Sequence, residues 1–322
     1  MALIEPFNMT KSRDSCEDSK NFEIVRVHRW GEIVATLFLA LLVAWIIRSV
    51  VKNEKFHWEV IGQYLFDEQV IHGLFLTLKL TAVAMTLAIV LGTILAQMRL
   101  SNNRVFVGFS WFYAWLMRGT PVLLQLVFFF NLGALYPTIS LGLPFIQPFA
   151  TWQTTELING WAAAILGLGF NIAANMAEVI RGGILGVDRK QVESGISLGM
   201  KKSMINRRVV WPQALRIIIP PTGNFVIIML LMTSLCSFIA LTDLLFTVQK
   251  IGARNFFVMP MLIVAAIWYL TITSILMVGQ YFLERRFGKS QWSQVHVKLE
   301  KPVNDLEPAE EAGKAAHDAQ RN

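Results

Sequence analysis

The sequence predicts an all-α integral membrane protein with about six transmembrane helices. Two observations support this: few residues are charged, and those few lie between long apolar runs. Only 16% of the 322 residues are charged, against about 25% in a typical soluble domain. A helix needs about 20 mostly apolar residues to cross the hydrocarbon core of a bilayer. The charge-poor runs place spans near residues 31–51, 74–98, 119–136, 158–180, 217–236 and 259–283.

These runs are apolar on every side. A soluble helix carries one apolar stripe, so a large soluble α-bundle is disfavoured. Lipid offers the backbone amides no partner, which favours helices as the spanning elements. The first run, Ile33 to Ile47, is short, and it reaches Val51 if Arg48 snorkels to the headgroups. No small-residue cleavage site follows it, so we interpret it as a retained helix rather than a signal peptide.

Basic residues indicate the orientation. They gather in three regions: Arg99 with Arg104, the loop from Arg181 to Arg216, and the segment from Arg285 to Lys289. With six spans these regions share one side, which the positive-inside rule makes the cytoplasm. Both termini are then cytoplasmic. Arg48, Lys52 and Lys55 oppose the rule, but the large basic loop outweighs them.

The segments between the spans have distinct compositions. Residues 104–118 combine arginine with tryptophan and tyrosine, which suits a helix at the membrane interface. Residues 137–157 contain three prolines and are expected to form an outer loop, with a re-entrant loop as the alternative. Residues 237–258 are expected to carry a short outer helix. The tail 299–322 has little to bury and is expected to be disordered.

No catalytic motif is present in the sequence. The triplet Gly288-Lys289-Ser290 resembles the end of a phosphate loop, but Leu283 stands where the leading glycine is required. The two cysteines provide neither a disulfide framework nor a metal spacing. We therefore expect no enzyme activity and no cofactor. The net charge of +7 is explained by basic cytoplasmic loops, so we expect no nucleic-acid partner.

The informative segment runs from Glu178 to Asn224. Proline and glycine divide it into short pieces, and the piece Val187 to Leu198 predicts a helix of about three turns. Gly199 follows and suits a left-handed cap. So short a helix is marginal alone in water, which indicates an element that docks into a partner.

The stretch Glu193-Ser-Gly-Ile-Ser-Leu-Gly199 resembles the EAA signature of ABC import permeases. The surrounding segments resemble the polar amino-acid permease family: Arg118-Gly119-Thr120-Pro121, Ala177-Glu178 with Arg181-Gly182-Gly183, Pro212-Gln213-Ala214-Leu215-Arg216, Pro220-Pro221 with Gly223-Asn224, and Thr233-Ser234-Leu235. The resemblance covers about residues 70–288. It implies a permease that moves polar amino acids or similar small solutes, coupled to ATP hydrolysis by a separate chain.

The resemblance also implies the organisation of the chain. A cytoplasmic polar N-terminus, 1–30, and an extra transmembrane helix, 31–52, precede a five-helix permease core at 70–288 with its cytoplasmic coupling helix. The location is the bacterial cytoplasmic (inner) membrane. The implied partners are an ATP-binding-cassette ATPase dimer, a second permease copy or a paralogous permease, an extracytoplasmic solute-binding protein and membrane lipid.

The family's motif implies two sets of functional residues. The coupling helix would meet the ATPase through Glu193, Ser194, Gly195, Leu198 and Gly199. The candidate substrate pathway comprises Asn171, Asn175, Glu178, Asn224, Thr233 and Ser234. Several polar positions of the family are apolar here, including Leu231, where members usually carry lysine. Either the substrate is less polar, or the chain pairs with a different permease that holds the ligand; we prefer the second.

Two other classes of function remain open. An ion-coupled secondary transporter would show repeated halves and ionisable residues within the spans. No repeat is visible, and only Lys79 and Glu178 lie near span ends. A membrane scaffold derived from a permease is the other alternative, because of the apolar substitutions.

Overall fold

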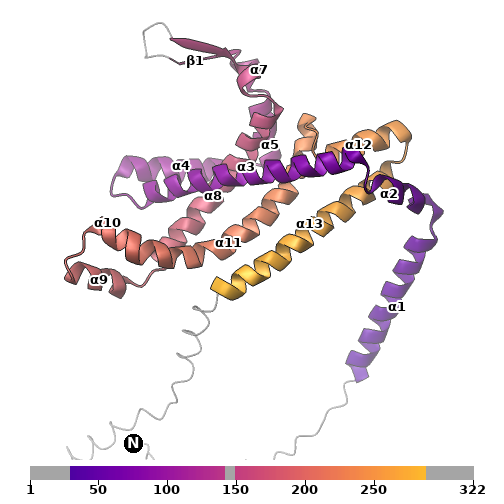
Figure 1. The fold of residues 1–322 in the computed structure, drawn as a ribbon, viewed down its shortest axis with the longest axis horizontal. Helices are drawn as coiled ribbons and strands as arrows, with labels where there is room; N and C mark the ends of the chain where they lie inside the picture. The colour runs from indigo at the N-terminus through magenta and orange to yellow at the C-terminus, as the bar shows by residue number, and fades with distance from the viewer. Residues whose placement is uncertain (1–29, 142–148, 288–322) are drawn as a thin grey trace, which may run out of the picture. The chain divides into compact units, whose positions relative to one another are not determined.

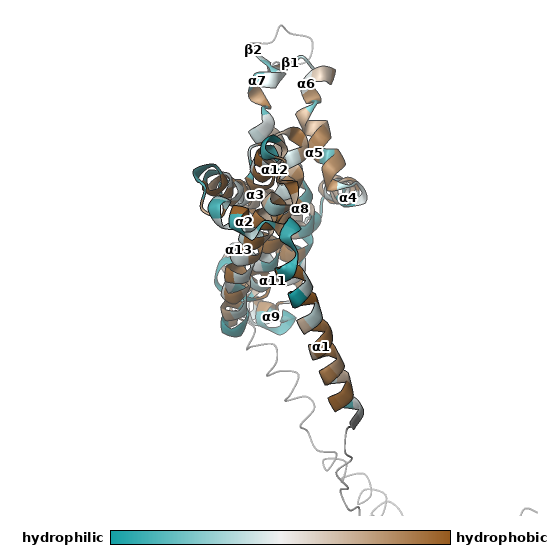
Figure 2. Cartoon of the chain, turned by 90° about the vertical axis from the view of Figure 1, so that its right-hand side faces the viewer, coloured by the Kyte–Doolittle hydropathy of each residue, from teal (hydrophilic) through white to brown (hydrophobic). Residues whose placement is uncertain are grey.

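The computed structural model describes residues 30–141 and 149–287. The expectations for the polar N-terminus and for the tail fall outside these residues, apart from Trp30. The chain forms two compact units, residues 1–56 and 57–322. The first unit contains α1 (Trp30–Lys52) and the short helix η2 (Glu54–Phe56). Figure 2 shows α1 coloured as hydrophobic along most of its length, and it is long enough to cross a membrane.

The second unit carries the long helices (Figure 1). In order they are α2 (Trp58–Tyr64), α3 (Glu68–Arg99), α4 (Arg104–Gly119), α5 (Val122–Phe130), α6 (Leu132–Leu135), β1 (Thr138–Leu141), β2 (Ala150–Gln153), α7 (Thr154–Leu157), α8 (Gly160–Leu185), α9 (Arg189–Ser197), α10 (Lys202–Ile205), η3 (Asn206–Val210), α11 (Trp211–Met232), η4 (Thr233–Ile239), α12 (Leu244–Asn255) and α13 (Val258–Phe287).

Five helical stretches of the described chain are long and apolar enough to span a membrane: α1, α3, α8, the run from α10 to η4, and α13. A sixth candidate is the bent pair α4 and α5. The prediction of an α-helical membrane protein with about six spans is therefore confirmed. A short helix is present within 237–258, as expected, and it is α12.

The bundle is built around α3 and α8, which lie closely packed along their lengths. Buried small residues recur every four positions on α3 (Ala84, Ala88, Gly92, Ala96) and on α8 (Gly169, Ala173, Ala177). A Cβ added at Gly92 would lie 2.7 Å from the Met176 Cβ. Small residues at this spacing let two backbones approach closely, which is how helices associate when lipid is the solvent.

The expected third span is not one continuous helix over 119–136. The chain bends by 101° between α4 and α5. Pro121 stands at the N-cap of α5, where its missing N–H is not needed. At about 1.5 Å per residue, the nine residues of α5 are too short to cross a bilayer alone. The expected interfacial helix over 104–118 is present as α4, and together with α5 it passes the length and composition test for a broken span or a re-entrant loop.

The loop 137–157 contains a β-hairpin, which is the only β-structure among the described residues. β1 and β2 pair antiparallel, with Thr138 opposite Gln153 and Leu141 opposite Ala150. The small helices α6 and α7 flank this hairpin, and the Thr154 amide donates to the Pro137 carbonyl at 3.0 Å. The re-entrant alternative lacks support in the residues that are described.

A second apolar cluster joins α2, α12 and α13 to the start of α3. Ile61 on α2 is buried there, and the Trp268 indole donates to the Leu65 carbonyl at 2.8 Å. At the opposite end of the unit, α3 and α8 finish, α11 begins and α13 ends, beside α9 and α10 (Figure 1). We name this end the basic end, because most of the arginines and lysines of the basic loop lie there.

Candidate functional site

The helix expected between Val187 and Leu198 is present as α9. Asp188 caps its N-terminus, since its carboxylate accepts a hydrogen bond from the Lys190 amide at 2.9 Å. Asp is among the preferred residues at this position because the first amides of a helix have no partner within it. The local sequence therefore sets the start of α9 at Arg189.

Gly199 ends α9 in the left-handed conformation, as expected, with a φ of +72°. The Met200 amide donates to the Gly195 carbonyl at 3.1 Å, and the Gly199 amide donates to the Ile196 carbonyl at 2.9 Å. This pair of hydrogen bonds is the Schellman motif, which satisfies carbonyls that the helix leaves free. Gly199 permits the turn because it has no Cβ to clash.

The inner face of α9 rests on the short helix that follows it. Gly195 is buried, and a Cβ added there would lie 3.1 Å from Ile205 Cγ1. Val192 on the same face packs against the core of the bundle. An alanine, the residue usual in the family signature, thus needs only a small adjustment, whereas a large side chain would push α9 off its support.

The outer face of α9 is exposed, and Figure 2 shows the helix coloured mainly as hydrophilic. Glu193, Ser194 and Ser197 are exposed, and Leu198 at its end is 80% exposed. The serine hydroxyls donate to carbonyls one turn back in their own helix. The Glu193 carboxylate makes no hydrogen bond or ion pair with another described residue, so it is free to meet a partner chain.

Glu178 lies at the centre of an ion cluster toward the basic end. Its Oε1 is 2.7 Å from Arg99 Nη1, and its Oε2 is 3.0 Å from Arg181 Nη2. The three side chains are about a quarter to a third exposed. Beside the cluster lies a pocket of about 380 Å³, lined by Arg99, Arg118 and Glu178 with the indoles of Trp111 and Trp115. Charged and aromatic groups thus face the same space.

Asn171 is buried at the bend between α4 and α5. Its amide donates to the Met117 carbonyl at 2.8 Å. Gln125, also buried, donates to the same carbonyl at 2.8 Å and to the Thr120 hydroxyl at 2.7 Å. The bend leaves the last carbonyls of α4 without helical partners, and these amides replace them. Asn175, one turn along α8, donates only to the Asn171 carbonyl at 3.3 Å.

The three substrate-pathway candidates that follow Pro220 differ in whether their polar groups are free to bind a solute. Thr233 is fully buried, and its hydroxyl donates to the Leu230 carbonyl at 2.6 Å. The half-buried Ser234 donates similarly to the Leu231 carbonyl at 2.7 Å. Asn224 is exposed, and its side chain makes no hydrogen bond to another described residue. The six candidates are therefore spread along α8, α11 and η4, and Glu178 is the one among them that lines the pocket beside the ion cluster.

Three partners were absent from the sequence interpretation: Arg99 for Glu178, Gln125 for Asn171, and Gln280 for the proline pair of α11. Gln280 on α13 donates to the Pro220 carbonyl at 2.7 Å, and its side-chain oxygen lies against Gly223. Two of these partners could have been found from the sequence, because Gln125 and Gln280 are isolated glutamines within apolar runs, and a polar group in a span needs a partner.

Comparison with known proteins places this geometry in a family. The sequence model of the family "Binding-protein-dependent transport system inner membrane component" matches residues 88–289, which is more than half of the chain. The chain belongs to this family. It is a multi-pass inner-membrane permease, and its family implies an ATPase and a solute-binding protein as partners. The resemblance found in the sequence is confirmed.

Named relatives cover most of the chain. The arginine transport system permease protein ArgU of Corynebacterium glutamicum is 43% identical over 297 residues, which are 92% of this chain and 92% of the relative. The L-cystine transport system permease protein TcyB of Bacillus subtilis is 33% identical and covers 67% of this chain and 86% of its own length. The histidine/lysine/arginine/ornithine permease HisQ of Escherichia coli is 29% identical, over 70% and 96% of the two chains.

A solved structure has the same fold. The crystal structure of an amino acid ABC transporter with histidines aligns with a TM-score of 0.57 at 32% identity, covering 68% of this chain and 94% of that one. This match confirms the fold class and the assignment as a transport subunit rather than an enzyme.

Proposed function

We propose that this permease imports polar amino acids, driven by an ATPase that acts on it through α9. The observation that carries the proposal is the mounting of α9. Its inner face is seated on Ile205, its C-terminus is closed by the Gly199 cap, and its free carboxylate, Glu193, points outward. A helix held at both ends and polar on its outer face suits docking into a partner and transmitting a displacement.

The proposal places the basic end in the cytoplasm. The described residues at this end include Arg189, Lys190, Lys201, Lys202, Arg207, Arg208, Arg216, Arg285 and Arg286. Basic loops are retained on the cytoplasmic side during insertion. The hairpin of β1 and β2 and helix α12 then face outward, where a solute-binding protein would deliver its ligand. Both termini are cytoplasmic in this arrangement.

The substrate class is supported by the names of the relatives. Arginine, cystine and histidine/lysine/arginine/ornithine are the solutes that three of those names give. The arginine system is 43% identical over nearly the whole chain. We therefore take basic amino acids as the first solutes to test.

The same proposal covers whether the permease pairs with a second copy of itself or with a different permease. Asn171 and Thr233 already use their polar groups in internal hydrogen bonds, and Glu178 is paired with two arginines. Asn224 is the pathway candidate whose side chain is free among those described. This supports a heterodimer in which a paralogous permease supplies most of the ligand contacts, with a homodimer as the alternative.

Replacing Glu193 tests the coupling role. Glu193→Ala removes one charge-assisted contact worth about 1.5–3 kcal/mol, which is roughly a tenfold to hundredfold loss in docking. Co-purification of the ATPase and uptake of labelled arginine should both fall, while the amount in the membrane stays near normal. The matched control is Glu156→Ala, another exposed carboxylate, on α7 at the other side. Equal ATPase capture and uptake by the two variants would remove α9 from the coupling role.

Substrate choice is tested separately by competition. Cells lacking their own basic amino-acid uptake, and expressing the permease with its co-encoded subunits, should take up labelled arginine. Unlabelled lysine and histidine should compete, whereas unlabelled sugars should not. If arginine is not transported but another amino acid is, the import role stands and the basic substrate class is wrong.

A further inference from the structure

The basic end contains a cleft that the transport site does not use. Its upper part is a pocket of about 360 Å³ between α3, α8, α11 and α13, and we name it the crevice. Its walls are almost entirely apolar. The side chains come from Ile89, Thr93, Met176, Ile180, Leu215, Ile218, Ile219, Thr222, Val226 and Leu283, with Trp211 and Gly223 completing the lining.

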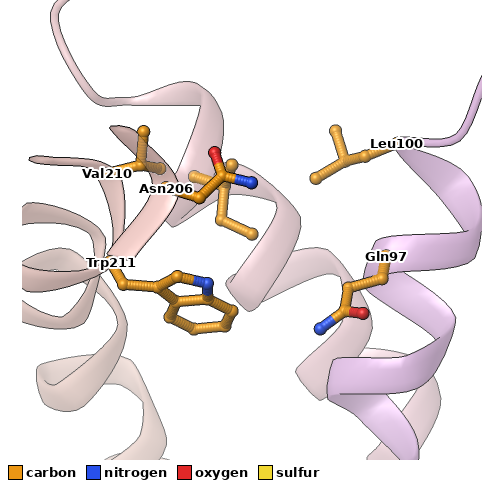
Figure 3. Close-up of a pocket in the computed structure, with 6 residues that line it drawn as sticks. Gln97, Leu100, Asn206, Val210 and Trp211 are labelled. Atoms are coloured by element: carbon orange, nitrogen blue, oxygen red, sulfur yellow. The ribbon is translucent and has the colours of Figure 1, made fainter. Parts of the chain in front are cut away.

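The lower part of the cleft has two amide side chains among apolar ones. A second pocket of about 370 Å³, which we name the mouth, is lined by Gln97, Leu100, Ile184, Asn206, Val210 and Trp211. In Figure 3 the Gln97 side chain projects from one wall, and Asn206 and Trp211 project from the other. Trp211 lines both pockets, so the mouth and the crevice adjoin. Neither amide side chain, nor the Trp211 indole N–H, makes a hydrogen bond to another described residue.

The cleft has the depth of one bilayer leaflet. The distance along the axis of α3 from Gln97 at the mouth to Ile89 in the crevice is about 12 Å, at 1.5 Å per residue. From Trp211 to Val226 is about 22 Å along α11 by the same rise. Half of a hydrocarbon core is about 15 Å. Tryptophan is enriched where the hydrocarbon meets the headgroups, and Trp211 lies between the crevice and the mouth.

Several arginines directly follow or closely neighbour residues that line the cleft. Arg207 and Arg208 directly follow Asn206 and are exposed. Arg216 stands next to Leu215, and Arg285 and Arg286 lie two and three residues beyond Leu283. The one carboxylate among these neighbours in the described chain, Glu284, accepts a hydrogen bond from Gln280. The local charge is therefore strongly positive, and basic pockets between transmembrane helices favour anionic headgroups.

We propose that the cleft binds one anionic phospholipid, with an acyl chain in the crevice and the phosphate at the mouth. An amino acid would leave the apolar crevice unfilled, and a free phosphate would use the mouth alone. A helix of a second copy would bury the three free donors of the mouth without partners. A phospholipid matches both parts and joins α3 to α11 and α13. The proposal is independent of the substrate and of the role of α9.

Quenching by brominated lipids tests the site. The full-length chain, in nanodiscs, is titrated with brominated phosphatidylglycerol or brominated phosphatidylcholine, and Trp211→Phe identifies the Trp211 contribution among the ten tryptophans. We expect Trp211 to be half-quenched at about a 30-fold lower mole fraction of the anionic lipid, since Arg207 and Arg208 near the surface contribute about one kcal/mol each. Arg207→Gln with Arg208→Gln should abolish this preference. Thr93→Phe, which fills the crevice, should reduce quenching by both lipids.

The matched control is Lys201→Gln with Lys202→Gln, which removes the same charge from exposed positions of the same loop. It should keep the preference, and thermal unfolding should confirm that every variant is folded. The proposal is overturned if both lipids quench Trp211 equally, or if the control loses the preference as the arginine variant does. It is also overturned if soluble glycerol phosphate alone removes the preference, because the mouth then recognises a free phosphate.

Discussion

The Asn171 amide donates to the Met117 carbonyl across the 101° bend that breaks the third span, at 2.8 Å. This hydrogen bond gives a carbonyl at the end of α4 a partner in the absence of a continuing helix. Membrane spans tolerate broken helices where side chains re-satisfy the backbone in this way. Asn171 therefore has a structural role, whether or not it also contacts the substrate.

Asn171→Leu should destabilise the protein by about 0.5–1.5 kcal/mol, because it removes one of the two side-chain donors to the Met117 carbonyl, while Gln125 keeps the other. Thermal unfolding of the purified chain in detergent measures the change. Asn175→Leu is the matched control on the same helix, since the Asn175 amide makes only a 3.3 Å bond to its own helix. If Asn171→Leu keeps its stability but loses uptake, Asn171 acts on the substrate instead.

Two neighbouring glycines of α8 should respond oppositely to substitution. A side chain at Gly183 would collide with Ile218 on α11, whereas a Cβ at Gly182 meets nothing within 4 Å. Gly183→Leu should therefore separate α8 from α11 and lower stability by about 1–3 kcal/mol or more. Gly182→Ala should be neutral or stabilising by up to about 1 kcal/mol, because alanine favours helix. Unfolding midpoints measure both, and a tolerated Gly183→Leu would contradict this packing.

Gly199 should accept asparagine but not valine. Its φ of +72° is open to glycine and tolerable for asparagine, while a β-branched residue there is strained. Gly199→Val should leave membrane insertion intact but misdirect the end of α9, so that ATPase co-purification and uptake fall about tenfold or more for a cost above 1.4 kcal/mol. Gly199→Asn should retain most of both. Equal behaviour of the two variants would show that the cap geometry is not required.

Asp243 should make stability fall as the pH rises. Its carboxylate caps α12 by accepting from the Phe246 amide at 2.9 Å, and it is 1% exposed between η4 and α12. Burial raises the pKa of Asp243 to about 6, although the backbone amides of Phe246 and Leu245 partly offset it. An unfolded Asp titrates near 3.9, so the folded state binds the proton more tightly.

The stabilising effect of that proton is complete below about pH 4 and is lost as the pH rises to about 6. The loss is about 3 kcal/mol at 1.36 kcal/mol per pKa unit. Asp243→Asn keeps an acceptor for the cap and does not ionise. The stability of Asp243→Asn relative to the wild type should therefore rise between pH 4.5 and 7.5. Thermal unfolding across this range measures the difference, and parallel curves for the two proteins would refute the shift.

The sequence by itself determined the features that depend on neighbours along the chain. Charge-free runs located the spans, since lipid excludes charge over a length that composition alone reveals. The α9 helix and its Gly199 cap followed from residues within one turn of each other, because capping bonds are local. The family resemblance also followed from short motifs in their order.

Only the tertiary structure decided which polar groups satisfy one another. Arg99 meets Glu178, and Asn171 meets Met117 and Gln125, across 46 to 79 positions of sequence. The sequence separated a helix at 104–118 from a span at 119–136, but it gave neither the 101° bend between them nor the end of α5 at Phe130, because apolar composition does not tell a straight helix from a broken one. The small-residue contact of α3 with α8 likewise required the two helices side by side. Such pairings depend on the angles and positions at which the helices cross. The composition of the individual segments does not specify that geometry.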